Sequence, residues 1–327
     1  MHRLSVLTMP RIPTLADWAT LFLLTFLWGT AFMFNELALA SFSPAVLVTG
    51  RVTLAAFCLL ILMPLFGIKL PPLGRGWLYL VAMAILGTVL PFSLTAWAQQ
   101  YIDSAVAGVL LAAMPLFVLT LAHFFVPGSR LTAARAAGFV LGFGGVALLI
   151  GPDALRGLSG NMALLGSFAV LGAALSFAVN AVLARRVAVS NPLGLASGTM
   201  LLASLLSIPT AVTGLASTTL PPTGAALGAI LFLGLLSTGL ATVMYFRLIQ
   251  GPGPTFVSLV NYIVPGWAVV AGALVLGEEL SLHVFAGLTM ILASLAISEF
   301  GGRTADLLSR LLNNRVSTVR RPAREDA

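Results

Sequence analysis

The chain has 327 residues, of which 59% are hydrophobic and only 8% are charged, and it carries a formal net charge of +7. A soluble domain is about 25% charged, so this composition excludes a water-soluble enzyme, a nucleic-acid-binding protein and a disordered chain. We therefore predict an all-α polytopic membrane protein, with the lipid bilayer as its surroundings.

Apolar runs of about 20 residues, the length that crosses a bilayer, recur along the whole chain. They predict ten transmembrane helices at 16–37, 44–66, 77–98, 104–126, 133–151, 161–184, 193–214, 224–247, 254–276 and 281–300. The connections between them are short, so we expect neighbouring helices to run antiparallel.

Basic residues predict the direction of insertion. With the N-terminus in the cytoplasm, all of the 17 basic residues except Arg51 and Arg156 fall on the cytoplasmic side, as the positive-inside rule requires. Both termini are therefore predicted to be cytoplasmic. Lys69 is the only lysine beside 16 arginines, a bias typical of GC-rich bacterial genomes, so we expect a bacterial inner membrane. The arginine-rich tail 302–327 is either a solvated cytoplasmic end or a patch that binds anionic lipid headgroups.

The residues that carry catalytic or metal chemistry are sparse. Cys58 is the single cysteine, and His2, His123 and His283 lie far apart. A polytopic enzyme acting on lipids is the alternative from another class, and it would need a metal-binding cluster or a nucleophile–histidine pair at membrane depth. We expect no metal, no cofactor and no catalytic residues, and the oligomeric state is left open.

The two halves of the chain resemble each other. Pro115 is followed by Gly128-Ser129-Arg130-Leu131, and Pro265 is followed by Gly277-Glu278-Glu279-Leu280. Ser43-Pro44 likewise matches Asn191-Pro192. We predict a cytoplasmic N-terminus at 1–15 and five-helix repeats at 16–152 and 158–301. Because five is odd, the second repeat enters the membrane from the opposite side, which is the inverted arrangement that supports alternating access in transporters.

Several short motifs are spread over both halves of the chain: Trp28-Gly29-Thr30-Ala31-Phe32, Pro44 followed by Arg51, the two prolines Pro115 and Pro265, Ala184-Arg185-Arg186, and Gly277-Glu278-Glu279-Leu280. In this order they resemble the EamA-type ten-helix transporters of the drug/metabolite transporter superfamily. The resemblance covers about 16–301 and implies export of amino acids or related small metabolites. Efflux of drugs or toxic organic compounds is the alternative. Ser129 departs from the family's usual glutamate, and Thr199 stands at the position that matches Arg51.

Charged residues inside the spans are candidates for function because they are costly in hydrocarbon. Arg51 could attract a substrate carboxylate, or it could snorkel to the headgroups or pair with a helix C-terminus or Glu36. All carboxylates fall near helix ends or in loops, so carboxylate-based antiport lacks its central residue and facilitated export is favoured. Glu278 and Glu279 are expected to cap the last helix.

Mid-span prolines and polar side chains predict a substrate cavity at the centre of the bundle. Pro115 and Pro265 are expected to break the fourth and ninth helices, or merely to kink them. The candidate lining residues are Trp28, Thr95, Trp97, Asn180, Ser237, Thr238, Tyr245, Asn261 and Tyr262. Their alternative roles are interhelical hydrogen bonds and interfacial belts. Gly138, Gly142, Gly144 and Gly145 are expected to allow close helix packing.

Overall fold

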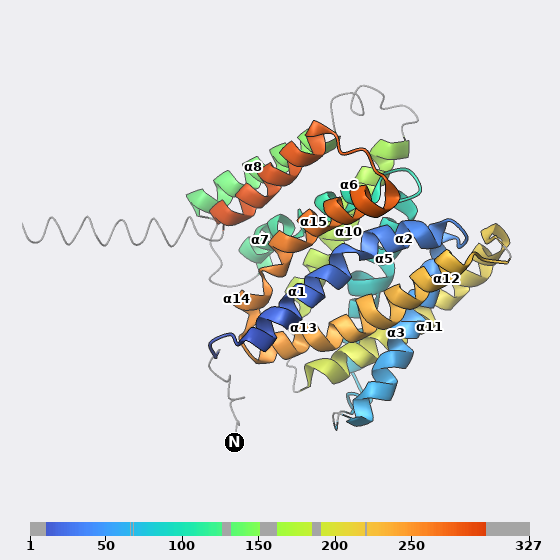
Figure 1. The fold of residues 1–327 in the computed structure, drawn as a ribbon. Coiled ribbons are helices and arrows are strands. Elements are labelled where there is room, and N and C mark those ends of the chain that lie inside the picture. Colours follow the sequence, from blue (N-terminus) through green and yellow to red (C-terminus); the bar gives the residue numbers. More distant parts are fainter. Residues whose placement is uncertain are drawn as a thin grey trace, which may run out of the picture.

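The computed structural model describes residues 11–65, 67, 69–125, 132–150, 162–184, 191–219 and 221–298, and over these residues it is helical with no strand (Figure 1). The predicted tail 302–327 and most of the N-terminal segment lie outside the described residues. The first half comprises α1 Leu15–Gly29, α2 Ala31–Leu39, α3 Pro44–Leu65, α4 Gly76–Ala84, the π-helix η1 Ile85–Val89, α5 Leu90–Ala98, α6 Ser104–Leu111, α7 Met114–Phe125 and α8 Ala133–Ile150.

The second half begins with two long helices and ends with shorter ones. It comprises α10 Met162–Ala184, α11 Pro192–Gly214, η2 Leu215–Ser217, α12 Gly224–Leu231, the π-helix η3 Phe232–Leu240, α13 Ala241–Gln250, α14 Pro254–Val257, α15 Val260–Ala271 and the π-helix η4 Gly272–Leu276. A last helix, Leu282–Ser298, follows.

Eight helical stretches of the described chain are long and apolar enough to cross a membrane, and the stretches Val260–Leu276 and Leu282–Ser298 are shorter apolar helices. The bounds of all ten segments lie close to the predicted runs. Large apolar side chains such as Phe57, Val140 and Leu274 are 60%, 71% and 80% exposed on the outside. Such an outer surface suits lipid and would be unfavourable in water.

Local sequence signals explain where several helices begin. Thr14 and Asp17 form a reciprocal capping box at the start of α1. The side chain of Asn191 accepts a hydrogen bond of 3.1 Å from the Gly194 amide, next to a proline that fits the first helical turn of α11. Caps of this kind satisfy backbone donors that the first helical turn leaves free.

Helices of the two halves interleave. α1 packs against α13 and α15, α2 against α12, α3 against α11 and η3, α5 against α10, and α6 against α15. We name the two ends of the bundle after the first span, which runs from the Leu15 end to the Leu39 end. At the Leu39 end the Thr219 amide donates to the Ser41 carbonyl at 2.8 Å, and so connects two loops from different halves.

The helix α8 approaches the last helix closely because glycines face it, and Figure 1 draws the two side by side. A Cβ on Gly138 would lie 2.7 Å from the Ser294 carbonyl oxygen, and one on Gly145 would lie 2.9 Å from Met290 Cβ. A Cβ on Gly142 would collide with the side chain of Leu116. These contacts agree with the packing role expected for the glycines of this helix.

Candidate functional site

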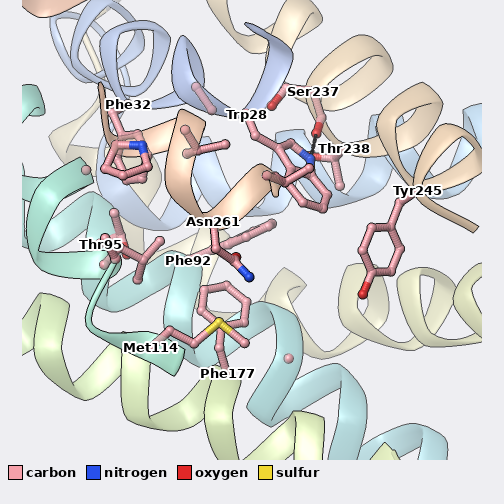
Figure 2. Close-up of a pocket in the computed structure, with 18 of the residues that line it drawn as sticks. Trp28, Phe32, Phe92, Thr95, Met114, Phe177, Ser237, Thr238, Tyr245 and Asn261 are labelled. Carbon is pink, nitrogen blue, oxygen red and sulfur yellow. Dashed lines mark hydrogen bonds between the residues drawn. The ribbon is translucent and has the colours of Figure 1, made fainter. Parts of the chain in front are cut away.

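A cavity of about 480 Å³ lies at the centre of the bundle, and side chains from both halves line it (Figure 2). Trp28 and Phe92 come from the first half, whereas Phe177, Thr238 and Asn261 come from the second. This volume is within the range of pockets that hold small organic molecules.

The walls of the cavity are mainly apolar. The rings of Phe92 and Phe177 meet edge to face with their centroids 6.3 Å apart. Figure 2 shows these rings and Met114 around the side chain of Asn261, which is exposed within the cavity. Such a lining would take up the apolar body of a ligand, while an amide could orient it.

Arg51 is the only charged residue among the described residues that line the cavity. It is 7% exposed. Its Nε donates to Thr238 Oγ1 at 2.8 Å, and its Nη1 donates to Asn35 Oδ1 at 3.4 Å. The guanidinium carbon lies 4.0 Å from the centroid of the Phe92 ring, which is a cation–π distance. Neutral groups thus hold this charge in place.

A polar chain behind Arg51 fixes its position. Gln99 Nε2 donates to the Phe32 carbonyl at 2.8 Å, and Asn35 Nδ2 donates to Gln99 Oε1 at 3.0 Å. The donation from Asn35 leaves its carbonyl oxygen facing Arg51. On the other side, Gly234 lets η3 approach α3, since a Cβ there would be 3.0 Å from the Arg51 carbonyl oxygen. This close approach allows Thr238, about one turn further along η3, to reach the guanidinium.

The structure brings most of the predicted residues together. The residues of the sequence-based list that line the cavity are Trp28, Thr95, Ser237, Thr238, Tyr245 and Asn261, and Arg51, Pro115 and Pro265 line it too. The indole of Trp28 donates to the Ser237 carbonyl at 3.1 Å and its ring lies 5.5 Å from that of Tyr245. The Thr95 hydroxyl donates to the carbonyl of Pro91 within its own helix at 2.8 Å.

Three predicted residues do not line this cavity. The ring of Trp97 lies 5.1 Å from that of Tyr101, near the Leu39 end. Asn180 packs behind the wall, because a Cβ on Gly87 would lie 2.5 Å from its Nδ2. Tyr262 packs against the apolar cluster that joins α6 and α15. Asn35, Phe92 and Phe177 line the cavity instead, and the sequence analysis did not single them out.

The two mid-span prolines behave differently. α6 ends at Leu111 and α7 begins at Met114, so the chain is interrupted directly before Pro115 as expected. The expected break at Pro265 is not found, because α15 continues through it. Proline removes only one hydrogen bond of a helix, and a packed transmembrane helix can tolerate that loss. The interruptions of this span lie instead between α14 and α15 and at η4.

Acidic side chains gather at the Leu39 end. Glu278 accepts hydrogen bonds from the Ser104 amide at 2.8 Å, the Ser104 hydroxyl at 2.5 Å and the Ala105 amide at 3.0 Å. It therefore caps α6, and the expectation that it caps the last helix is wrong. Partial loss of hydration, and then the Glu278 carboxylate, raise the pKa of Asp103.

Glu36 belongs to this acidic group and not to Arg51. It lies within electrostatic range of Glu278 and Asp103, and its Oε2 is buried without a hydrogen-bond partner in the described chain. The suggested pairing of Arg51 with Glu36 is therefore not found. The described lining of the cavity contains no carboxylate.

The cavity extends toward the Leu15 end. Its lining reaches Ile249 and Ser258, close to the end of α13 and the start of α15. Toward the Leu39 end, Asn35 of the lining is bonded to Gln99, and Glu278 caps α6.

Comparisons with known proteins agree with this architecture. Residues 18–151 and 164–300 match the EamA-like transporter family. The chain is 28% identical to the uncharacterized inner membrane transporter YedA of Escherichia coli, over 86% of this chain and 90% of that protein. It is 22% identical to the uncharacterized transporter YvbV of Bacillus subtilis, over 88% and 93%. One crystal structure with 19% sequence identity has the same fold, with a TM-score of 0.66 over 89% of this chain and 98% of that chain.

Proposed function

Since this chain belongs to the EamA-like transporter family, we propose that it is a secondary transporter that exports amino acids or related small metabolites by alternating access. The cavity carries this proposal. It is large enough for a small metabolite, and it is lined by both halves of the chain. A transporter needs such a site, which it exposes to each side of the membrane in turn.

The helix pairing supports two related halves, here proposed as inverted repeats at 16–152 and 158–301 with ten spans in all. Exchanging the halves turns the packing of α1 on α15 into that of α10 on α6 and α7, and both are present. It turns the packing of α5 on α10 into that of α13 on α1, which is also present. A rough two-fold relation between the halves explains these matched pairs.

The proposed orientation places the Leu15 end and both termini in the cytoplasm of a bacterial inner membrane. The positive-inside rule supports it. In this orientation the cavity extends toward the cytoplasm, so the described conformation is one that would load a cytoplasmic substrate. The absence of a carboxylate in the described lining favours facilitated export over carboxylate-based proton antiport.

Counterflow in proteoliposomes tests the proposal, with labelled amino acids and with or without a pH gradient. We expect counterflow that does not depend on the gradient. Asn261→Leu should reduce it about tenfold, because an amide that hydrogen-bonds the substrate is worth roughly 1–1.5 kcal/mol. Asn180→Leu is the matched control, since Asn180 does not line the cavity, and it should leave counterflow unchanged.

Three results would contradict parts of this proposal. Accumulation driven by the pH gradient would refute facilitated export. Equal effects of the two leucine variants would refute the cavity as the transport site. Counterflow of apolar drugs but of no amino acid would assign the protein to drug efflux, for which the aromatic walls offered by Phe92 and Phe177 are suited.

A further inference from the structure

The guanidinium of Arg51 is a buried charge with neutral neighbours. Thr238, Asn35 and Phe92 contact it, and no carboxylate of the described chain forms an ion pair with it. A buried charge without a counter-ion is unfavourable unless it serves to bind one. The position of Arg51 in the cavity wall makes a ligand the natural source of that negative charge.

Hydrogen-bond donors remain free beside this charge. Nη2 of Arg51 donates to no described residue, since Nε and Nη1 make its only hydrogen bonds there. The Thr238 hydroxyl accepts from Nε, and its own proton has no acceptor among the described side chains or carbonyls. A guanidinium and a neighbouring hydroxyl together match the two oxygens of a carboxylate.

The described lining of the cavity offers no carboxylate that could form an ion pair with a cation. It contains no aspartate or glutamate, and Glu278 is bonded to the start of α6 at the Leu39 end. Phe92, which could otherwise face a ligand cation, already lies against Arg51. The remaining walls, with Phe177, Met114 and Met200, suit an apolar body.

We propose that Arg51 and Thr238 form the carboxylate subsite of this cavity, and that the protein selects organic monocarboxylates with an apolar body, whether or not they carry an amino group. This inference rests on the transport function proposed above. It defines the substrate class by the carboxylate, which the substrate must carry, and not by the ammonium group, which it does not need.

A matched set of ligands tests the requirement. L-leucine carries both charges and 4-methylpentanoate only the carboxylate. L-leucinamide has a neutral amide in place of the carboxylate, and 3-methylbutylamine lacks the carboxyl group altogether and carries only an ammonium group. A parallel set has the phenylalanine skeleton. We expect the two carboxylates of a set to compete in counterflow and to bind the detergent-purified protein with similar affinity. The amide and the amine should bind about tenfold to a hundredfold more weakly, the range expected for hydrogen bonds to a charged group.

Variants locate the subsite. Arg51→Gln should abolish the preference for carboxylates, and Thr238→Val should weaken carboxylate binding while Arg51 stays in place. Arg247→Gln is the matched control, because Arg247 is exposed on α13 and does not line the cavity. Size-exclusion chromatography of each variant establishes that it is folded. If Arg51→Gln does not fold, Thr238→Val still tests the subsite.

The outcomes separate this inference from the function on which it rests. Three results would each overturn the carboxylate subsite. Amines or amides could bind as well as the carboxylates, no carboxylate of either set could bind, or a folded Arg51→Gln protein could keep the preference for carboxylates. If counterflow of amines or drugs persists in those cases, the transport function stands. If no compound of any class gives counterflow, both proposals fail.

Discussion

The contact between Glu278 and α6 leads to a prediction whose size follows from its hydrogen bonds. Glu278→Ala removes one carboxylate that accepts from the amides of Ser104 and Ala105 and from the Ser104 hydroxyl. Losing a helix N-cap costs about 0.5–2 kcal/mol of stability. The loss of a hydrogen bond to a charged group costs about as much as the upper end of this range, or more.

Two effects reduce this figure. Glu278 is only half-buried, so water replaces part of what is lost. The substitution also removes a negative charge that lies near Glu36 and Asp103. We therefore expect the free energy of unfolding to fall by about 2 kcal/mol, near the capping value alone.

The neighbouring Glu279→Ala is the matched control. Glu279 is exposed, and its side chain forms no hydrogen bond with the described residues. Denaturant titration in detergent should separate the two variants, and hydrogen exchange should show faster exchange of the α6 amides in Glu278→Ala only. Equal titration midpoints for the two variants, or protected α6 amides in Glu278→Ala, would refute the capping argument. Because α6 contributes Gly108 and Leu111 to the cavity wall, we also expect slower transport by Glu278→Ala.

Two further predictions concern stability. Gly138→Ala should destabilise the protein by about 1–3 kcal/mol relative to Gly144→Ala in thermal unfolding. At Gly138 the new methyl group would come within 2.7 Å of the Ser294 carbonyl oxygen, whereas at Gly144 it would meet only the flexible end of a methionine side chain at 3.2 Å. Both substitutions gain the same helix propensity, so this gain cancels in the comparison. Equal stabilities of the two variants would contradict the packing role of Gly138. Asp103→Asn should raise the stability at neutral pH, since the raised pKa of Asp103 means that its ionised form is disfavoured in the folded state. This gain should disappear as the pH falls to the ordinary aspartate pKa of about 3.9, where the native carboxyl is also protonated, and a gain that grows in acid would refute it.

The membrane helices were predictable because their cause is local. A run of about 20 apolar residues suffices to define a span, and Pro44 and Pro192 mark helix starts that the structure places at the same residues. The direction in which each side chain points was not predictable in the same way. These helices are apolar on every face, so their sequences lack the polar stripe that normally shows which side is buried.

The two asparagines illustrate this limit. Asn180 and Asn261 look equivalent in sequence, as amides within apolar spans, but only Asn261 lines the cavity. The π-helical segments η1, η3 and η4 add to the difficulty, since each inserts an extra residue into a turn and rotates the faces that follow it. A regular helical period therefore assigns the wrong face to part of such a span.

Arg51 combines what a sequence can and cannot reveal. An arginine in an apolar span is conspicuous, and its cost in hydrocarbon marks it as functional or paired. The choice between those roles depends on Thr238, Asn35 and Phe92, which come from three other spans and surround the guanidinium with neutral groups. A single carboxylate among them would have made Arg51 a structural ion pair. Because the described neighbours provide none, the guanidinium in the cavity wall has no counter-ion among the described residues, and the carboxylate subsite proposed above rests on this observation.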